Sequence, residues 1–198
     1  MRRLASKRFG MTPISAFFFV GLALREGSGM LWATLLAAAL HECGHLLAAR
    51  LMKIPIRGIR LDFLGARIDV GAVVLSYGQE WLLAAAGPLF SLLLATLAAP
   101  FWSVSLFLRA FSAASLLLGI LNLLPVRSFD GGRMLECFLC CRLGAMNGER
   151  IMQGFTFVSL FLLWLTAVYL LFHTGGGLSL FCFSVSLFAR FLENGKVS

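Results

Sequence analysis

Long apolar runs separated by short polar segments make up most of the chain. The runs lie at residues 10–24, 30–49, 81–99, 110–126, 152–172 and 178–192. An α-helix needs about 17–25 mostly apolar residues to cross the hydrocarbon core of a bilayer. The pattern therefore predicts an all-α polytopic membrane protein with about six transmembrane helices, of which the first and the last are short.

Residues 54–79 are a long stretch without such a run. Apolar and charged residues alternate there on both sides of Leu64-Gly65-Ala66, which is the pattern of two β-strands around a turn. The alternating residues are Ile59, Arg60, Leu61, Asp62 and Phe63 before the turn, and Arg67, Ile68, Asp69 and Val70 after it. We expect a small membrane-associated β-hairpin near residues 57–72, leaning on the helices or the membrane surface because a two-stranded ribbon is marginal alone. Its unpaired edge could accept another strand, although a purely connecting role fits the pattern equally well.

Composition excludes both a soluble and a disordered chain. Of the 198 residues, 60 % are hydrophobic and 13 % are charged, and the mean hydropathy is +0.90. Soluble domains carry about 45–50 % apolar and about 25 % charged residues. A disordered chain requires few apolar residues and a high charge. We therefore expect a single membrane-embedded domain over residues 1–198.

The basic residues indicate how the chain is oriented in the membrane. The formal net charge is +8, from 17 Lys and Arg against 9 Asp and Glu. With the amino terminus in the cytoplasm, the apolar runs leave Arg25 and Arg109 outside and every other Lys and Arg inside, as the positive-inside rule requires. We expect a multi-pass protein of the cell membrane with both termini in the cytoplasm. Its basic residues are then explained by topology and anionic lipid, and no nucleic acid is expected as a partner.

The cysteines do not predict disulfides. Their number, five, is odd, and Cys137, Cys140 and Cys141 fall on the cytoplasmic side, where thiols stay reduced. The Cys137-Phe-Leu-Cys140 spacing could be half of a zinc or redox motif, but no second half accompanies it. We interpret these residues as ordinary thiols on an apolar helix face.

Polar residues interrupt the second apolar run at His41-Glu42-Cys43-Gly44-His45. On a helix, His41 and His45 project from one face about one turn apart and can share a metal ion. In this HExxH arrangement two neutral imidazoles bind zinc, and the glutamate reaches the open position where water binds. Ionisable residues within a span are costly and are functional candidates by default. We therefore predict that His41 and His45 bind one Zn²⁺ and that Glu42 is a general base; a structural histidine pair is the alternative.

A hydrolytic zinc usually takes three protein ligands, so we expect a third at similar depth. The candidates are Glu26, Asp62, Asp69, Asp130 and His173. Asp130 is the best of them, because Pro125 ends the preceding helix and Gly131-Gly132 permits a non-helical backbone, tolerated at membrane depth only where it is buried or lines water. The carboxylates of Asp130 and Glu42 also balance the charge of a divalent ion. A helix-capping role for Asp130 is the alternative.

These motifs resemble the site-2 protease family of intramembrane zinc metalloproteases. The resemblance is carried by HExxH, by Ala86-Gly87-Pro88, and by Asn122-x-x-Pro-x-x-x-x-Asp130-Gly-Gly, in that order along the chain. It is closest to the bacterial branch containing stage IV sporulation protein FB. It implies that His41, His45 and Asp130 are zinc ligands and that Glu42 activates the water.

The same resemblance assigns further parts of the chain. Asn122 matches a family asparagine that helps to position substrate or to stabilise the oxyanion, with a helix-packing amide as the alternative. The hairpin resembles the family's membrane-associated β element that contacts substrate. Family members often have Asn a few residues after Gly-Pro, where this chain reads Gly87-Pro88-Leu89-Phe90-Ser91. We expect no PDZ domain and no CBS domain.

The function implied is that of an intramembrane zinc metalloprotease acting near the cytoplasmic face. Its substrate would be a membrane protein or a membrane-bound peptide within the lipid bilayer, as in pro-sigma or anti-sigma factor processing. A regulatory membrane partner is also possible. A metal transporter or sensor is an alternative, but a conducting path needs polar residues in several spans, and residues 10–24, 152–172 and 178–192 are almost wholly apolar. An inactive relative serving as a scaffold is a second alternative, for which loss of Glu42 would be expected.

Overall fold

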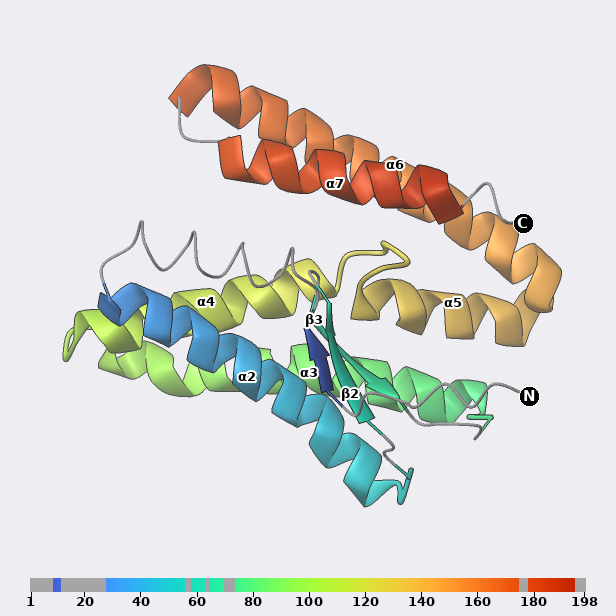
Figure 1. The fold of residues 1–198 in the computed structure, drawn as a ribbon, viewed down its shortest axis with the longest axis horizontal. Helices are drawn as coiled ribbons and strands as arrows, with labels where there is room; N and C mark the ends of the chain where they lie inside the picture. Colours follow the sequence, from blue (N-terminus) through green and yellow to red (C-terminus); the bar gives the residue numbers. More distant parts are fainter. Residues whose placement is uncertain are drawn as a thin grey trace. The chain divides into compact units, whose positions relative to one another are not determined.

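The computed structural model describes residues 9–11, 28–55, 58–62, 65–69, 74–174 and 178–194. These residues belong to two compact units, Met1–Leu123 and Leu124–Ser198. Figure 1 shows the elements of both units.

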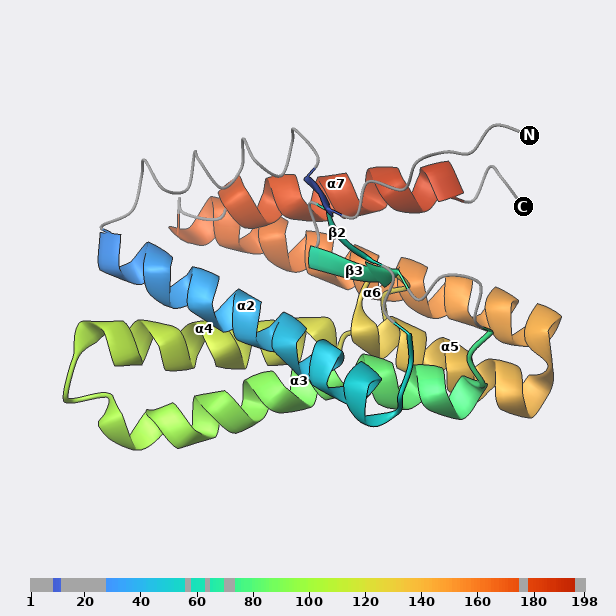
Figure 2. The same ribbon diagram turned by 60° about the horizontal axis from the view of Figure 1, so that its bottom comes forward.

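The first unit is built on three helices that all contact one another. They are α2 (Ser28–Leu51), α3 (Tyr77–Ala98) and α4 (Leu106–Asn122), with a short 3-10 turn η1 (Ala99–Phe101) after α3. Figures 1 and 2 both show α2 lying across the α3–α4 pair. A capping box starts α3, in which Ser76 and Gln79 each bond the other's backbone N–H, and the hydroxyl of Ser105 caps α4.

Glycines bring these helices into close contact. A Cβ on Gly44 of α2 would lie 2.8 Å from the carbonyl oxygen of Ala86 and from the Cβ of Phe90, both on α3. A Cβ on Gly119 of α4 would lie 2.9 Å from the side chain of Leu92 on α3. Small residues at such crossings let helix backbones approach, which is how helices gain packing energy in an apolar environment. Gly44 therefore sets how closely the histidine-bearing part of α2 approaches α3.

The end of α2 is closed by a Schellman motif. Lys53 adopts a positive φ of 56°, its N–H donates to Arg50 O, and the N–H of Ile54 donates to Ala49 O. This pairing satisfies carbonyls that the last helical turn would otherwise leave open. Ile54 and Ala49 then pack together with Leu83 of α3 in one buried cluster. The motif thus ends the helix and ties its end to α3.

A three-stranded sheet lies in the same unit, in the order β1 (Phe9–Met11), β2 (Gly58–Asp62), β3 (Gly65–Asp69). β2 and β3 are antiparallel, with Ile59 opposite Ile68 and Asp62 opposite Gly65. The expected turn at Leu64-Gly65-Ala66 is wrong, because Gly65 and Ala66 are already paired in β3. β1 pairs in parallel with three residues of β2, so β2 is the central strand and, among the described strands, β1 and β3 form the two outer edges.

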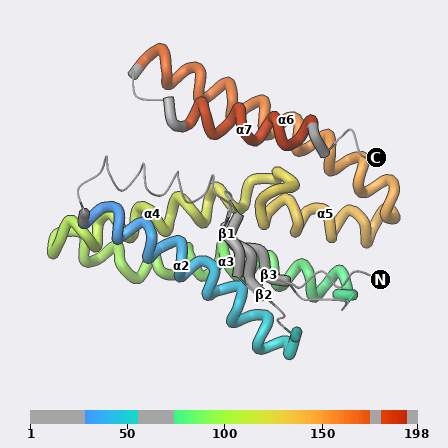
Figure 3. Tube along the Cα trace, in the orientation of Figure 1, coloured from blue at the N-terminus to red at the C-terminus, as the bar shows by residue number. Residues whose placement is uncertain are grey.

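The second unit consists of three helices that follow one another along the chain, and Figure 3 traces them. They are α5 (Asp130–Leu143), α6 (Ala145–Thr174) and α7 (Leu178–Asn194), with contacts between α5 and α6 and between α6 and α7. Gly144, with φ 80°, joins α5 to α6. A Cβ on Gly148 would lie 2.7 Å from the backbone nitrogen of Cys140, so this helical hairpin closes through a glycine contact.

Helix α5 was not expected, and its start corrects the prediction of a non-helical backbone at Gly131-Gly132. Both glycines are buried in the first turn of α5. A Cβ on Gly132 would overlap the backbone carbonyl of Val126, so this glycine provides room for the preceding loop to pack against the helix. The predicted run 110–126 likewise ends earlier, because α4 stops at Asn122.

Three of the described helices are long and apolar enough to cross a membrane. They are Gly29–Leu51, Tyr77–Phe101 and Ala145–His173, while Leu106–Asn122 and Leu180–Leu192 are shorter apolar helices. The expected count of about six spans is therefore not reached by length and composition within the described residues. The expected span 10–24 begins with Gly10 and Met11, which lie in strand β1, and its residues 12–24 lie outside the described part of the chain.

Candidate metal site

The two histidines of the HExxH motif lie together on one buried face of α2. His41 is 4 % exposed and His45 is 7 % exposed. Their ring centroids are 5.0 Å apart and the rings meet edge to face at 78°. The helical spacing of four residues therefore places the imidazoles as the sequence predicts, side by side and shielded from the surroundings.

Helix α3 holds both rings through their Nδ1 atoms. Nδ1 of His41 lies 2.9 Å from the hydroxyl oxygen of Ser91, and Nδ1 of His45 lies 2.8 Å from the carbonyl oxygen of Leu83. A carbonyl only accepts, so His45 carries its proton on Nδ1 when neutral and keeps the lone pair on Nε2. The Ser91 hydroxyl permits the same tautomer for His41. Fixing Nδ1 by an outer partner is the usual way in which proteins orient histidines that bind metals.

Gly87 leaves space for the ring of His45. A Cβ at residue 87 would overlap Nε2 of His45 and lie 2.5 Å or more from the next ring atoms. The Nε2 edge of His45 therefore occupies volume that any other residue type would fill. Together, the donor set and this cradle fit a zinc ion, which binds two imidazole nitrogens readily.

Glu42 and Cys43 lie on the same turn of α2. Glu42 is partly buried, whereas Cys43 is exposed. A step of one residue rotates a helical side chain by about 100°, so Glu42 lies beside the histidine face rather than on it. A carboxylate in this place can accept a proton from a water held at that face.

Asp130 is the first residue of α5 and is partly buried. The N-cap position belongs to Phe129, whose side chain makes no capping bond, and Asp130 lies in the first helical turn. An acidic residue in the first turn does complement the helix dipole. Asp130 belongs to the second unit, and its metal role stays a prediction.

The remaining described candidates belong to elements other than α2. Nδ2 of Asn122 donates to Leu118 O at 3.0 Å within α4, which is the bond expected of a packing amide. Asp62 and Asp69 lie in β2 and β3, and Glu26 lies outside the described residues. His173 is exposed near the end of α6, with its ring centroid 4.4 Å from that of Tyr169. None of the three cysteines of α5 is in a disulfide: Cys137 is buried and Cys141 is exposed.

Comparison with known proteins places the chain beside metalloproteases. Residues 98–166 match the model of peptidase family M50, a range that includes Asn122 and Asp130 but not the histidines of α2. Rip3 of Mycobacterium tuberculosis, provisionally named a zinc metalloprotease, is 29 % identical over 158 residues in the strains Erdman and H37Rv. That match covers 73 % of this chain and 37 % of Rip3, so the chain spans little more than a third of its curated relative.

The fold has a solved counterpart. The site-2 protease from Methanocaldococcus jannaschii matches with a TM-score of 0.63 at 21 % identity, covering 91 % of this chain and 85 % of that one. At this identity the match shows the fold alone. The chain therefore has the fold of a site-2 protease and resembles M50 peptidases in sequence.

Proposed function

We propose that this chain is an intramembrane zinc metalloprotease of the site-2 type. The observation that carries the proposal is the buried pair of imidazoles on α2, whose Nδ1 atoms are engaged by Ser91 and Leu83 of α3. That arrangement presents Nε2 of His45, and of His41 in the matching tautomer, as metal ligands within an apolar helix. Asp130 is the proposed third ligand and the two units together form one protease domain.

Zinc, when bound, supplies a Lewis acid that lowers the pKa of a water to about 7. The chain's own residues do the rest. His41 and His45 hold the ion, and Glu42 takes a proton from the attacking water and delivers it to the leaving nitrogen. The burial of both histidines keeps bulk water away from this reaction.

The sheet offers a place for an extended substrate. A membrane-spanning helix hides its peptide carbonyls in its own hydrogen bonds, so hydrolysis requires a segment to unwind. We propose that this segment pairs as an additional strand on the outer edge of β3. Substrates are then membrane proteins or membrane-bound peptides cut near the cytoplasmic face, with both termini of the chain cytoplasmic. Finer forms of this proposal are the processing of a pro-sigma or anti-sigma factor and membership of the branch of stage IV sporulation protein FB. Another is the six-span layout, in which residues 10–24, α4 and α7 are embedded beside the three long apolar helices.

The decisive experiment is Glu42→Gln in the full chain. We expect the variant to keep stoichiometric zinc and to lose all cleavage, because the amide preserves shape but cannot accept the proton. Cleavage is measured as new protein amino termini in membranes of cells that express each variant. Cys43→Ser, one residue further along and exposed, is the matched control and should cleave as the wild type does.

The same experiment separates the alternative of a metal transporter or sensor. A transporter would move zinc across vesicles containing the purified chain and would generate no new amino termini. Zinc flux without cleavage, or cleavage retained by Glu42→Gln, would overturn the protease.

A further inference from the structure

A buried threonine in α6 is bonded to the loop that precedes Asp130. Thr156 is 2 % exposed and lies between Phe155 and Phe157 in α6. Its hydroxyl oxygen accepts a hydrogen bond of 3.2 Å from the backbone N–H of Arg127. A hydroxyl buried among apolar side chains is costly unless it is bonded. The bond therefore ties the loop between α4 and α5 to the middle of α6.

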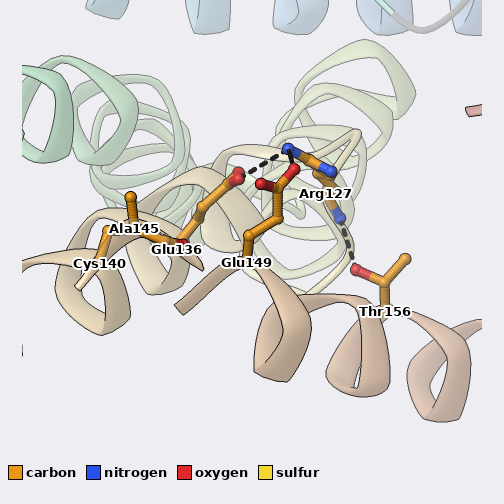
Figure 4. A network of polar contacts seen from close by, with 6 residues as sticks. All are labelled: Arg127, Glu136, Cys140, Ala145, Glu149 and Thr156. Atoms are coloured by element: carbon orange, nitrogen blue, oxygen red, sulfur yellow. Dashed lines mark hydrogen bonds and ion pairs between the residues drawn. The ribbon is translucent and has the colours of Figure 1, made fainter. Parts of the chain in front are cut away.

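The side chain of Arg127 forms ion pairs with carboxylates on α5 and α6. Its Nη2 lies 2.7 Å from a carboxylate oxygen of Glu149 on α6 and 3.0 Å from one of Glu136 on α5. Figure 4 shows one guanidinium nitrogen joined to both carboxylates, with the backbone nitrogen joined to Thr156. We call Arg127, Glu136, Glu149 and Thr156 the Arg127 cluster.

The electrostatics of the Arg127 cluster favour the charged guanidinium. Burial lowers the pKa of Arg127, but the hydrogen bond to Glu149 and the negative charges of Glu136 and Glu149 outweigh it, so the pKa is raised above its ordinary value. Without the arginine, two carboxylates from α5 and α6 would face each other with no cation between them. Two carboxylates close enough to bind the same nitrogen repel each other. Without Arg127 the loop would lose its ion pairs, and the repulsion would push α5 and α6 apart beside it.

Packing immobilises the rest of the loop just before Asp130. Val126 is 2 % exposed and Phe129 is 6 % exposed, and the ring of Phe129 stacks on Phe183 of α7 at 6.4 Å. Because Gly132 has no Cβ, the backbone carbonyl of Val126 can pack directly against α5. Residues 126–129 are thus held by all three helices of the second unit, and Asp130 is the next residue along the chain.

We propose that Arg127 is a positioning residue, and that the Arg127 cluster fixes the loop which sets the place of Asp130 as a zinc ligand. The inference rests on the proposed function, because it requires Asp130 to bind the metal. Ion pairs as exposed as these contribute little to folding. A displaced ligand, in contrast, weakens metal binding strongly, as changes to the residues around metal ligands typically show.

The test measures the zinc affinity of the purified full chain by competition with a chelator of known affinity. Arg127→Gln and Thr156→Val should each weaken zinc binding on the order of tenfold or more. Arg127→Lys should recover most of the loss, since an ammonium group still pairs with both carboxylates. Thr166→Val, which removes an exposed hydroxyl bonded to Leu162 O in the same helix, is the matched control and should bind as the wild type does. Arg142→Gln, which removes another exposed cation from α5, controls for net charge.

A thermodynamic cycle shows whether the effect passes through Asp130. In an Asp130→Asn background, Arg127→Gln should change zinc affinity no further, because the ligand it positions is already lost. Equal weakening in both backgrounds, or wild-type affinity in Arg127→Gln and Thr156→Val, would overturn the inference while leaving the protease standing. A wild-type chain that binds no zinc would overturn the proposed function and this inference together. If Arg127→Gln does not fold, Thr156→Val and Arg127→Lys decide by the same affinities.

Discussion

His45 lies so close to Gly87 that a single methyl group at residue 87 would occupy the position of its Nε2 atom. The contact joins the HExxH helix to the Ala-Gly-Pro segment of α3, two motifs that are far apart in the sequence. It assigns a physical reason to the glycine, namely that the ring needs the volume.

Gly87→Ala is therefore expected to displace the imidazole of His45 and to weaken zinc binding by at least tenfold. The same substitution at Gly78, which has nothing within 4 Å of its Cβ position, should leave zinc binding intact. In that exposed helix position it should also stabilise the fold by about 0.5–1 kcal/mol. Zinc stoichiometry and thermal unfolding of both variants in detergent measure the difference. Wild-type zinc affinity in Gly87→Ala would contradict the close approach.

Ser91→Ala removes the partner of His41 Nδ1 and should lower zinc affinity by about 10- to 100-fold. Ser112→Ala is the control, because Ser112 is equally buried and its hydroxyl bonds only Ala95 O. Both variants lose a buried hydroxyl, so a similar change in unfolding free energy is expected, about 1 kcal/mol. Only Ser91→Ala should change the affinity, and Ser91→Thr should restore it. Equal zinc affinities for the two alanine variants would count against the role of Ser91.

Zinc should stabilise the folded chain. A ligand that binds only the native state at about 100 times its Kd adds about 2.7 kcal/mol to the unfolding free energy. Removing zinc with a chelator should therefore lower the melting temperature of the wild type, and readding zinc should restore it. His41→Ala lacks a zinc ligand, so its melting temperature should be the same with and without the chelator. A wild type that is indifferent to the chelator would argue against a bound metal.

Lys53→Gly should stabilise the end of α2. Lys53 holds φ 56°, a left-handed conformation that costs a residue with a Cβ about 1–2 kcal/mol. Glycine adopts it freely but also gains freedom in the unfolded chain, so we expect a net gain of about 0.5–1 kcal/mol. Gly144→Ala is the converse, because φ is 80° there, and should be destabilising. Thermal unfolding in detergent reports both, and a loss of stability in Lys53→Gly would contradict the backbone strain assigned to Lys53.

The sequence was most informative where the contacts are local. The spacing of His41 and His45 is a property of one helix, so their shared face followed from the motif alone. The long apolar runs likewise predicted α2, α3 and α6, although their exact ends depend on caps such as Ser76.

Contacts between distant residues could not be read from the pattern. The bond between His41 and Ser91 spans 50 residues and depends on how α2 crosses α3. Helix α5 was missed because Gly131-Gly132 normally indicates a loop, whereas here Gly132 is needed to admit Val126. The same preference for glycine in turns led to Gly65 being expected in a turn, whereas it is paired with Asp62 in the sheet.

The pairing of β1 with β2 limits how any further segment can join the sheet. A free hairpin presents two rims, and a guest segment could run in either direction along each. With β1 paired along β2, the two outer edges among the described strands belong to β1, which is three residues long, and to β3, which is five residues long. A guest segment that joins the sheet cannot pair with the part of β2 that β1 covers, and β3 offers it the longer of the two remaining edges.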